Sequence, residues 1–271
     1  MTGSISTFAL YLNCLFMKPE PATHRLIKDT ATLSRTSESR AQGLFLAEGE
    51  KVVRELLQSP LETAYVLVRN DMQNAVPSGI KVPVYTCSSA DFDKVSALKT
   101  PAGILAVGRR PEAGRPAVPS PGHWVLAVDG ISDPGNLGTI LRTAEWFGIG
   151  EVVCAPGSAD CYSSKVVQSA MGSLFRMKVH YMPLLQYIKD VKEAQGVHVF
   201  AAALTGTPLH NSPQLDCGVL VIGSESHGIS AEVMAVVTNA VTILPAPDSI
   251  TESLNAAVAC GILLQHFCGK K

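Results

Sequence analysis

Neither sign of charge dominates this chain. It contains 22 lysine and arginine residues and 23 aspartate and glutamate residues, which gives a net charge of −1 at pH 7. The broadly basic surface that is typical of nucleic-acid-binding domains is therefore excluded, and any binding of RNA or DNA has to come from local features. Charged residues make up only 17% of the chain and hydrophobic residues 46%, so its 271 residues can form a sizeable core.

The cysteines and histidines show no metal-binding or disulfide pattern. The seven cysteines are odd in number and contain no C-x-x-C pair, and none of the seven histidines lies in an H-E-x-x-H motif. Most of the cysteines lie in apolar stretches, where a reduced thiol packs as a small hydrophobic side chain. We therefore expect free thiols, no metal site and a reducing, cytoplasmic location.

Two common nucleotide-binding loops and a membrane-spanning segment are also missing. The sequence has neither a P-loop nor a G-x-G-x-x-G motif after a strand-like run, and Gly148-Ile149-Gly150 is expected to end a helix. Phe8–Met17 is apolar, but a membrane span needs about 20 such residues. We expect no membrane segment, and we interpret Met17 as the natural start and residues 1–16 as an extension.

A stretch rich in proline and glycine divides the chain. Residues 108–122 contain four prolines and three glycines, a composition typical of linkers. We predict one domain over residues 17–107, a linker over 108–122 and a second domain over 123–271. The first domain is expected to be a small α/β unit, with a helix at Glu50–Gln58 and strands at Leu44–Ala47, Tyr65–Val68 and Ile104–Val107.

The second domain alternates between apolar runs and amphipathic segments. The predicted strands are Trp124–Val128, Glu151–Cys154, Met177–Tyr181, Val197–Ala203, Gly218–Ile222 and Ala240–Leu244. The predicted helices are Leu137–Phe147, Ser163–Met171, Leu184–Ala194, Ala231–Val237 and Ser253–Phe267. Continuous apolar strands between amphipathic helices indicate a parallel sheet that is covered on both faces.

Three polar segments follow apolar runs of this domain: Asp129–Arg142, Gly223–Gly228 and Glu252–Ala259. The carboxyl ends of parallel strands are where open α/β sheets bind ligands. In the first segment, Asn136 is a natural N-cap for a helix that begins at Leu137. Arg142 lies off the apolar stripe of that helix, as a solvated side chain or as a group that holds a phosphate or ribose oxygen.

The second segment, GSESHG, begins with a glycine that would let a ligand approach the backbone closely. Glu225 either accepts hydrogen bonds from loop N–H groups or faces a substrate. The segment does not form the G-x-S-x-G elbow of serine hydrolases, and His227 directly follows Ser226 and is poorly placed as its base. In the third segment, Ser253 is expected to cap the final helix, with Asn255 in its first turn.

Together these segments resemble the three motifs of the SpoU (TrmH) family of RNA ribose 2′-O-methyltransferases, within the SPOUT superfamily. The resemblance covers residues 122–271. It places the family's motif residues at Asn136, Arg142, Glu225, Ser253, Leu254 and Asn255. Two N-terminal segments, Gly43–Leu57 and Thr100–Val107, resemble the family's ribosomal-protein-like substrate-binding domain.

The resemblance implies a C-terminal trefoil knot, a homodimer built around it, and S-adenosylmethionine bound in a bent form within the knotted loops. It implies methylation of a ribose 2′-OH in RNA, in ribosomal rather than transfer RNA, without a metal. The implied cofactor-binding residues are Leu204, Thr205, Gly206, Gly223, Ile243, Leu244, Ala246, Ser253 and Leu254.

The implied catalytic residues are Arg142, Asn136, Glu225, Ser253 and Asn255. Arg142 would fix the ribose and an adjacent phosphate, because a guanidinium group does not readily lose its proton. Asn136, Ser253 and Asn255 would form a hydrogen-bonded floor, and Glu225 would anchor the loops.

The chain departs from the family pattern at two places, and three alternative functions stay open. Ala246 stands where the family usually has Met, and Ser34–Arg40 is less basic than the usual stretch. The alternatives are a non-catalytic RNA-binding relative, a SPOUT enzyme that methylates an RNA base, and a serine hydrolase. The motif residues Asn136, Arg142, Glu225 and Asn255 argue against the first alternative, and the Ser-Leu-Asn segment favours ribose over a base.

Overall fold

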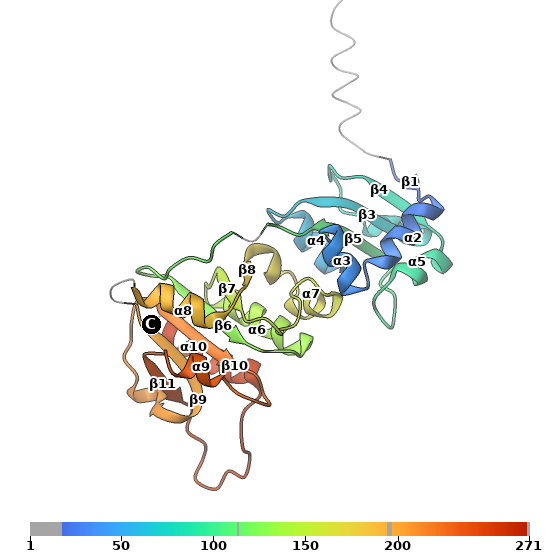
Figure 1. Ribbon diagram of the computed structural model, residues 1–271. Helices are drawn as coiled ribbons and strands as arrows, with labels where there is room; N and C mark the ends of the chain where they lie inside the picture. Colours follow the sequence, from blue (N-terminus) through green and yellow to red (C-terminus); the bar gives the residue numbers. More distant parts are fainter. Residues whose placement is uncertain (1–17, 113, 194–196, 270–271) are drawn as a thin grey trace, which may run out of the picture. The chain divides into compact units, whose positions relative to one another are not determined.

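The computed structural model describes residues 18–112, 114–193 and 197–269. The chain forms two compact units (Figure 1). The first combines the chain up to Pro111 with Tyr162–Phe175, and the second combines Glu112–Cys161 with the chain from Arg176 onward. The run Phe8–Met17 and the start expected at Met17 lie outside the described residues. Among the described residues, no helix is long and apolar enough to cross a membrane.

The first unit is built on a five-stranded mixed sheet of order β1-β4-β3-β5-β2. β5 is antiparallel to both of its neighbours, β2 and β3, whereas β4 pairs in parallel with β1 and β3. The predicted strands and helix of this unit are confirmed. The strands are β1 (Glu20–Pro21), β2 (Leu44–Glu48), β3 (Thr63–Arg69), β4 (Val84–Cys87) and β5 (Ile104–Arg109), and the helices are α2 (His24–Thr32), α3 (Thr36–Gln42), α4 (Glu50–Leu57) and α5 (Ser89–Val95).

The two faces of this sheet are covered by different helices. Ile27 of α2 and Phe92 of α5 pack in one core cluster with Leu46 and Leu105 of the sheet. Phe45, the neighbour of Leu46, must face the opposite side, because side chains alternate along a strand. On that side, the Phe45 ring lies 4.9 Å from the ring of Tyr162 and 5.7 Å from that of Phe175.

Residues 162–175 belong to the first unit, although they lie within the predicted second domain. Helix α7 (Ser164–Ala170) contacts β2, and Gln168 Nε2 donates to the backbone oxygen of Glu48 at 2.6 Å. The division into residues 17–107, 108–122 and 123–271 did not anticipate this. The predicted linker also begins inside β5, and Ala117 is held in place because its N–H donates to Glu151 and its carbonyl accepts from Tyr187.

The second unit contains a six-stranded, entirely parallel sheet of order β11-β9-β10-β6-β7-β8, as predicted. Its strands are β6 (Trp124–Asp129), β7 (Glu151–Cys154), β8 (Lys178–Tyr181), β9 (Val199–Pro208), β10 (Gly218–Gly223) and β11 (Asn239–Thr242). Its helices are α6 (Pro134–Trp146), α8 (Leu184–Glu193), α9 (Ala231–Met234) and α10 (Ala256–Cys268).

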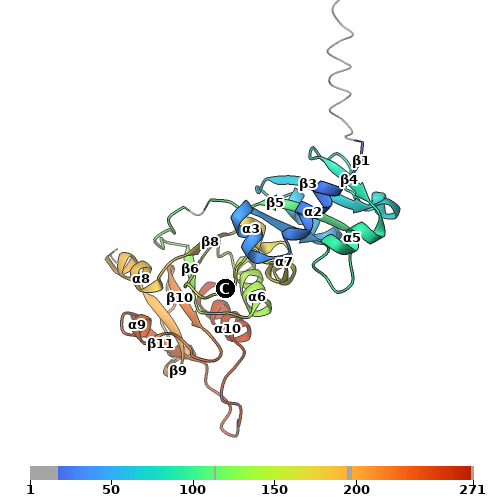
Figure 2. The same ribbon diagram turned by 45° about the vertical axis from the view of Figure 1, so that its right-hand side comes forward.

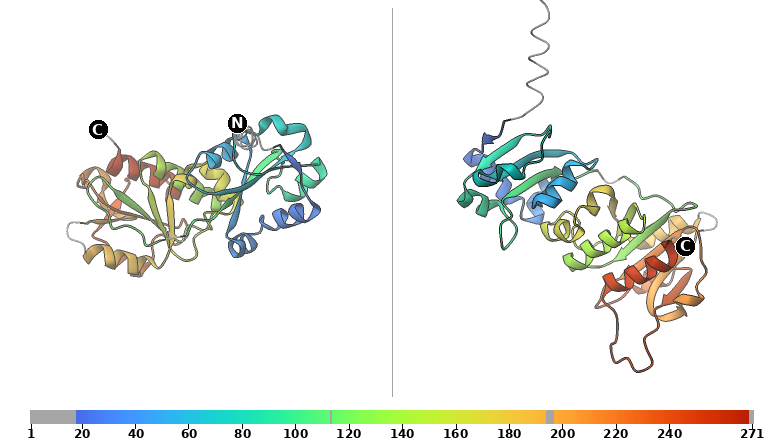
Figure 3. Two further views of the ribbon diagram at one scale, coloured as in Figure 1. Left: turned by 90° about the horizontal axis from the view of Figure 1, so that it is seen from above. Right: turned by 180° about the vertical axis from the view of Figure 1, so that it is seen from behind.

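Helices cover both faces of this sheet. α8 and α9 pack against one face, in a cluster that includes Val125 and Val199. The ring of Phe267 in α10 contacts the rings of Trp124 and Phe200, the strand neighbours that point the other way. The left view of Figure 3 shows the sheet between α10 and α8, and Figure 2 shows α10 beside α6, which it contacts.

Candidate active site

The order of the parallel strands reverses between β6 and β10. From β6 the chain continues to β7 on one side, whereas from β10 it continues to β11 beyond β9 on the other side. Because all strands are parallel, their carboxyl ends share one edge, and open α/β sheets bind ligands outside such a reversal. Two of the three polar segments begin at this point, one after each strand.

The structure brings together one predicted catalytic residue from each segment. Asn136 Nδ2 donates to Glu225 Oε1, and Asn255 Nδ2 donates to Asn136 Oδ1 at 3.0 Å. Glu225 lies 89 residues from Asn136 in sequence, and Asn255 lies 119 residues from it. We call these three side chains the amide–carboxylate network.

Asn136 is free to take part in this network because another residue caps its helix. α6 begins at Pro134, and Asp133 is its N-cap, with Oδ1 accepting from the N–H of Asn136 at 2.8 Å. The prediction that Asn136 caps a helix beginning at Leu137 is therefore wrong. Proline is favoured at the first position of a helix and aspartate at the N-cap, so the Asp-Pro pair was the missed signal.

Asn255 caps the last helix. Its Oδ1 accepts from the N–H groups of Ala257, at 2.9 Å, and Val258, at 3.3 Å. The prediction that Ser253 caps a helix beginning there is wrong, because α10 begins at Ala256 and Ser253 is exposed in the preceding loop. The polar character of Asn255 thus has two explanations, the cap and the bond to Asn136.

The Gly223–Gly228 segment closes on itself. Ser224 and Gly228 exchange two backbone hydrogen bonds, of 3.1 and 2.9 Å. A Cβ atom on Gly223 would lie 2.2 Å from the carbonyl carbon of Gly228, so the loop's own backbone requires glycine there. Asp129 Oδ2 accepts from the Ser230 N–H at 2.8 Å and ties the loop to the end of β6, a contact that sequence reasoning missed.

Ser226 and His227 lie at the exposed tip of this loop. Ser226 Oγ and His227 Nδ1 are 2.7 Å apart, a contact between sequence neighbours. Within the described chain, no carboxylate is bonded to His227. The pair lacks the third group that orients the base in a serine hydrolase.

Arg142 lies outside the amide–carboxylate network. It follows Asn136 by six residues on α6, which places it about 9 Å further along the helix axis. Its side chain is exposed, and no described residue forms a hydrogen bond or ion pair with it. The guanidinium group is therefore available to an anionic ligand.

The predicted cofactor-binding residues lie in a bulge of β9, at the end of β10 and after β11. β11 pairs with Ala201 and then with Thr207, so residues 202–206 of β9, which include Leu204, Thr205 and Gly206, bulge out of the ladder. Thr242 Oγ1 donates to the Leu204 carbonyl at 3.0 Å and links this bulge to the end of β11. Gly223 ends β10, and Ile243, Leu244, Ala246, Ser253 and Leu254 lie in the connection from β11 to α10, which projects from the unit in Figure 1.

Three leucines of this set are unusually exposed. The exposed fractions are 73% for Leu204, 57% for Leu244 and 46% for Leu254. Single exposed apolar residues are common, but three from the β9 bulge and the connection between β11 and α10 indicate a surface that an apolar group can cover.

The described part of the chain shows no cluster of metal ligands, and one of its buried thiols is chemically inert. No group of three or more His, Cys, Asp or Glu side chains there could hold a metal ion. Burial raises the pKa of Cys260, in α10, to about 12. A thiol with such a pKa is not a nucleophile at neutral pH.

Comparison with known proteins gives consistent matches over most of the chain. The family model described as "SpoU rRNA Methylase family" matches residues 123–265, and the "MRM3-like substrate binding domain" matches residues 25–106. The 23S rRNA (guanosine(2553)-2′-O)-methyltransferase RlmP of Bacillus subtilis is 35% identical, over 92% of this chain and 98% of its own length.

Two solved structures share the fold. A TrmH-family protein from Porphyromonas gingivalis has a TM-score of 0.81 and 34% identity, over 91% of this chain and 98% of its own. An AdoMet-bound rRNA methyltransferase from Sinorhizobium meliloti has a TM-score of 0.79 and 25% identity, over 92% and 96%. The resemblance of the three motifs is thereby confirmed, and this chain belongs to the SpoU rRNA methylase family.

Proposed function

We propose that this protein transfers a methyl group from S-adenosylmethionine to a ribose 2′-OH of ribosomal RNA. The observation that carries the proposal is the amide–carboxylate network, which joins the three motif segments where the strand order reverses. The B. subtilis relative is named for this reaction on 23S rRNA, which makes guanosine 2553 the first nucleotide to test.

The loops beside the network suit a cofactor with an apolar part and many polar atoms. The exposed side chains of Leu204, Leu244 and Leu254 offer the apolar contacts. The backbone of Thr205 and Gly206 lies outside the strand ladder and offers hydrogen bonds, with Gly223, Ile243, Ala246 and Ser253 alongside. When bound there, S-adenosylmethionine would supply an electrophilic methyl group.

The side chains of the site would position the RNA ribose for methyl transfer. Arg142 has no partner among the described residues and binds the ribose and an adjacent phosphate through its planar fork. Asn136, Asn255 and Ser253 provide hydrogen bonds at the floor of the site. Glu225 accepts from Asn136 and thereby holds its loop against α6. Alignment of this kind is worth several orders of magnitude in rate.

We also propose that the second unit contains the family's trefoil knot and that the protein forms a homodimer. α10 follows the edge strand β11 but packs against α6, so the connection 243–255 has to cross β9 and β10, as a knotted chain would. Val258 and Ile262 lie one turn apart on α10 and are 52% and 39% exposed, which suits a second copy of the chain. A ribosomal RNA substrate and reduced thiols would be consistent with a reaction in the cytoplasm.

The test is methylation of unmodified 23S rRNA transcript by the purified protein with labelled S-adenosylmethionine, followed by alkaline hydrolysis. A ribose 2′-O-methyl group blocks cleavage of the adjacent linkage, so we expect one resistant position. Incorporation of label without resistance would instead indicate a base methyltransferase. Calorimetric titration that detects no cofactor binding, together with no methylation, would indicate the non-catalytic RNA-binding relative.

A further inference from the structure

We propose that His227 is the base that accepts the proton of the ribose 2′-OH during methyl transfer. This histidine lies at the exposed tip of the Gly223–Gly228 loop, two residues after Glu225. It differs chemically from the three side chains of the amide–carboxylate network, because imidazole is the side chain that gains and loses a proton near neutral pH. The inference rests on the proposed function, since it names a group that this reaction needs.

Methyl transfer to a ribose requires a group that accepts the hydroxyl proton. The ribose O–H bond breaks while the new O–CH3 bond forms and the bond between the methyl carbon and sulfur breaks, so the proton has to leave the oxygen. Arg142 cannot take it, because a guanidinium group is already protonated and keeps its proton in proteins. The amides of Asn136 and Asn255 donate and accept hydrogen bonds but do not act as bases.

The carboxylates near the loop are less suited to this task. Three of them accept hydrogen bonds that hold the site together, and they are Asp129, Asp133 and Glu225. Two more, Asp248 and Glu252, are exposed in the connection from β11 to α10. A base is most efficient when its pKa lies near the working pH, which at neutral pH favours an imidazole over an ordinary carboxylate. Among the described residues of the three segments, His227 is the only imidazole.

The loop holds this imidazole in a defined place. Ser224 and Gly228 exchange two backbone hydrogen bonds, and the N–H of His227 donates to Ser224 Oγ at 3.2 Å. Glu225 accepts from Asn136, so the loop is fixed to α6 just before the histidine. Two residues of chain span at most about 7 Å, which keeps the Cα atom of His227 within that distance of the Cα atom of Glu225.

Ser226 suits the tautomer that a base needs. Its Oγ lies 2.7 Å from Nδ1 of His227. When the neutral imidazole carries its proton on Nδ1 and donates it to this oxygen, Nε2 keeps its lone pair and can accept a proton. The side chain of His227 is exposed, so Nε2 is accessible to a ribose that Arg142 holds from α6. The same exposure lets the imidazolium pass its proton on to water.

The first test is the pH dependence of methyl transfer to 23S rRNA transcript in single-turnover reactions. An imidazolium cannot accept a proton, so we expect the rate of the unmodified protein to fall between about pH 8 and about pH 5. His227→Ala should be about 100-fold slower at neutral pH and should lose this fall. His123→Ala is the matched control and should keep both, because His123 is exposed in the same unit but precedes β6, at the opposite edge of the sheet.

Added imidazole distinguishes a missing base from a damaged fold. It should raise the rate of His227→Ala about tenfold, because a free imidazole molecule can take the proton in place of the lost side chain. It should not raise the rate of Arg142→Ala, which lacks a positioning group. Ser226→Ala should lose less of the rate than His227→Ala and should keep the pH dependence, since the base itself remains.

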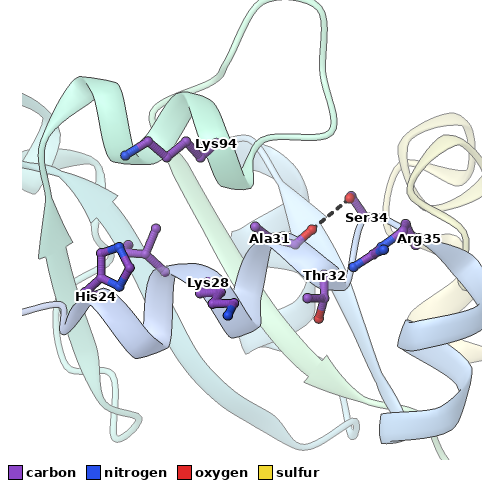
Figure 4. A pocket seen from close by; sticks show the side chains of 8 residues that line it. His24, Lys28, Ala31, Thr32, Ser34, Arg35 and Lys94 are labelled. Atoms are coloured by element: carbon purple, nitrogen blue, oxygen red, sulfur yellow. Dashed lines mark hydrogen bonds between the residues drawn. The ribbon is translucent and has the colours of Figure 1, made fainter.

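Chemical modification of histidine gives a readout that needs no turnover. Diethyl pyrocarbonate modifies exposed imidazole groups, and mass spectrometry detects each modified residue separately. With S-adenosylhomocysteine and transcript bound, His227 should react more slowly than in the complex with a transcript whose target nucleotide is 2′-deoxy, because the hydroxyl that contacts Nε2 is then missing. His24, exposed at the start of α2 in Figure 4, is the reference and should react equally in both complexes.

The outcomes separate this inference from the proposed function. If the unmodified protein methylates ribose, and His227→Ala keeps the pH dependence or a rate within about threefold, the assignment of His227 fails and the proposed function stands. Equal modification of His227 in both complexes would also overturn the assignment. If the unmodified protein methylates no ribose, the proposed function fails, and the assignment of a base to it fails as well.

Discussion

Asn255 carries out two tasks with one side chain. Its oxygen accepts from the first N–H groups of α10, and its amide nitrogen donates to Asn136. The beginning of the last helix and the geometry of the amide–carboxylate network are therefore set together. The two tasks need different atoms, so a substitution can separate them.

The substitution Asn255→Asp keeps an N-cap acceptor but removes the donor to Asn136. Because aspartate caps helices about as well as asparagine, we expect thermal stability close to that of the unmodified protein. The methyl-transfer rate should fall roughly 100-fold, since Asn136 loses one of its two anchors. Asn255→Ala is the control: it should lose the same activity and in addition about 1 kcal/mol of stability. An Asn255→Asp protein with full activity would show that the bond to Asn136 is dispensable.

Arg142 offers the most direct test of catalysis. Arg142→Ala should lower turnover roughly 100-fold or more, because positioning and proton-transfer groups usually contribute at least that much. Binding of S-adenosylmethionine, measured by calorimetry, should not change, since Arg142 is assigned to the RNA. Turnover within about threefold of the unmodified protein would remove Arg142 from the site.

At the scale of elements, the Gly223–Gly228 loop is a rigid connector. Two backbone hydrogen bonds close it, and the bond from Ser230 to Asp129 fixes its far end to β6. Glu225 is thus presented from a loop with little freedom to rearrange. The rigidity depends on the absence of a side chain at Gly223.

Gly223→Ala should therefore damage both stability and cofactor binding. The new methyl group would overlap the backbone of Gly228 and Ile229, and relief of such overpacking costs about 1–3 kcal/mol. Gly150→Ala is the matched control, because a Cβ atom there meets nothing within 4 Å. Urea denaturation and calorimetric titration with S-adenosylmethionine measure both effects. Equal behaviour of the two variants would contradict the close approach.

The sequence predicted strands better than helix ends. Each apolar run of the second unit became a strand, since burial on both faces requires continuous apolar residues. Helix starts were missed where several capping residues lie near one another: Asp133 and Asn136, and Ser253 and Asn255. Asn255, rather than Ser253, caps α10, and Asn255 also donates a hydrogen bond to Asn136, 119 residues away in sequence. A local sequence pattern contains no information about such a distant contact.

Helix α2 was missed for a related reason. Its sequence, HRLIKDTAT, is largely polar, and one of its buried residues is Thr30. The Thr30 hydroxyl donates to the Leu26 carbonyl at 2.7 Å and lies 2.7 Å from the hydroxyl of Tyr65. A polar side chain can be buried when a distant residue forms a hydrogen bond with it. Such a residue interrupts the apolar periodicity from which an amphipathic helix is predicted.

At the scale of the whole molecule, the units do not follow the order of the chain. The sequence pattern of an amphipathic helix such as α7 indicates that one face of the helix is buried. The pattern does not indicate which sheet that face packs against. Tyr162 and Phe175 cover Phe45, and a Cβ atom on Gly172 would meet Glu55 at 2.6 Å. The first unit is incomplete without these residues.

A fragment of residues 18–111 should therefore fold poorly. Without Tyr162–Phe175, the ring of Phe45 is uncovered, and we expect binding of a hydrophobic dye and a broad thermal transition. Phe175→Ala in the full chain should cost about 3–5 kcal/mol, as truncation of a buried phenylalanine usually does. A fragment that melts cooperatively and leaves the dye unbound would show that α7 is not needed.

The split first unit has a consequence for synthesis on the ribosome. Residues up to Pro111 emerge first, but the segment that completes their core ends at Phe175, 64 residues later (175 − 111). At a translation rate of roughly 5–20 residues per second, part of the sheet of the nascent first unit stays uncovered for about 3–13 s. The core of the first unit can be completed only after the first strands of the second unit, β6 and β7, have been synthesised. We therefore expect the two units to finish folding at about the same time.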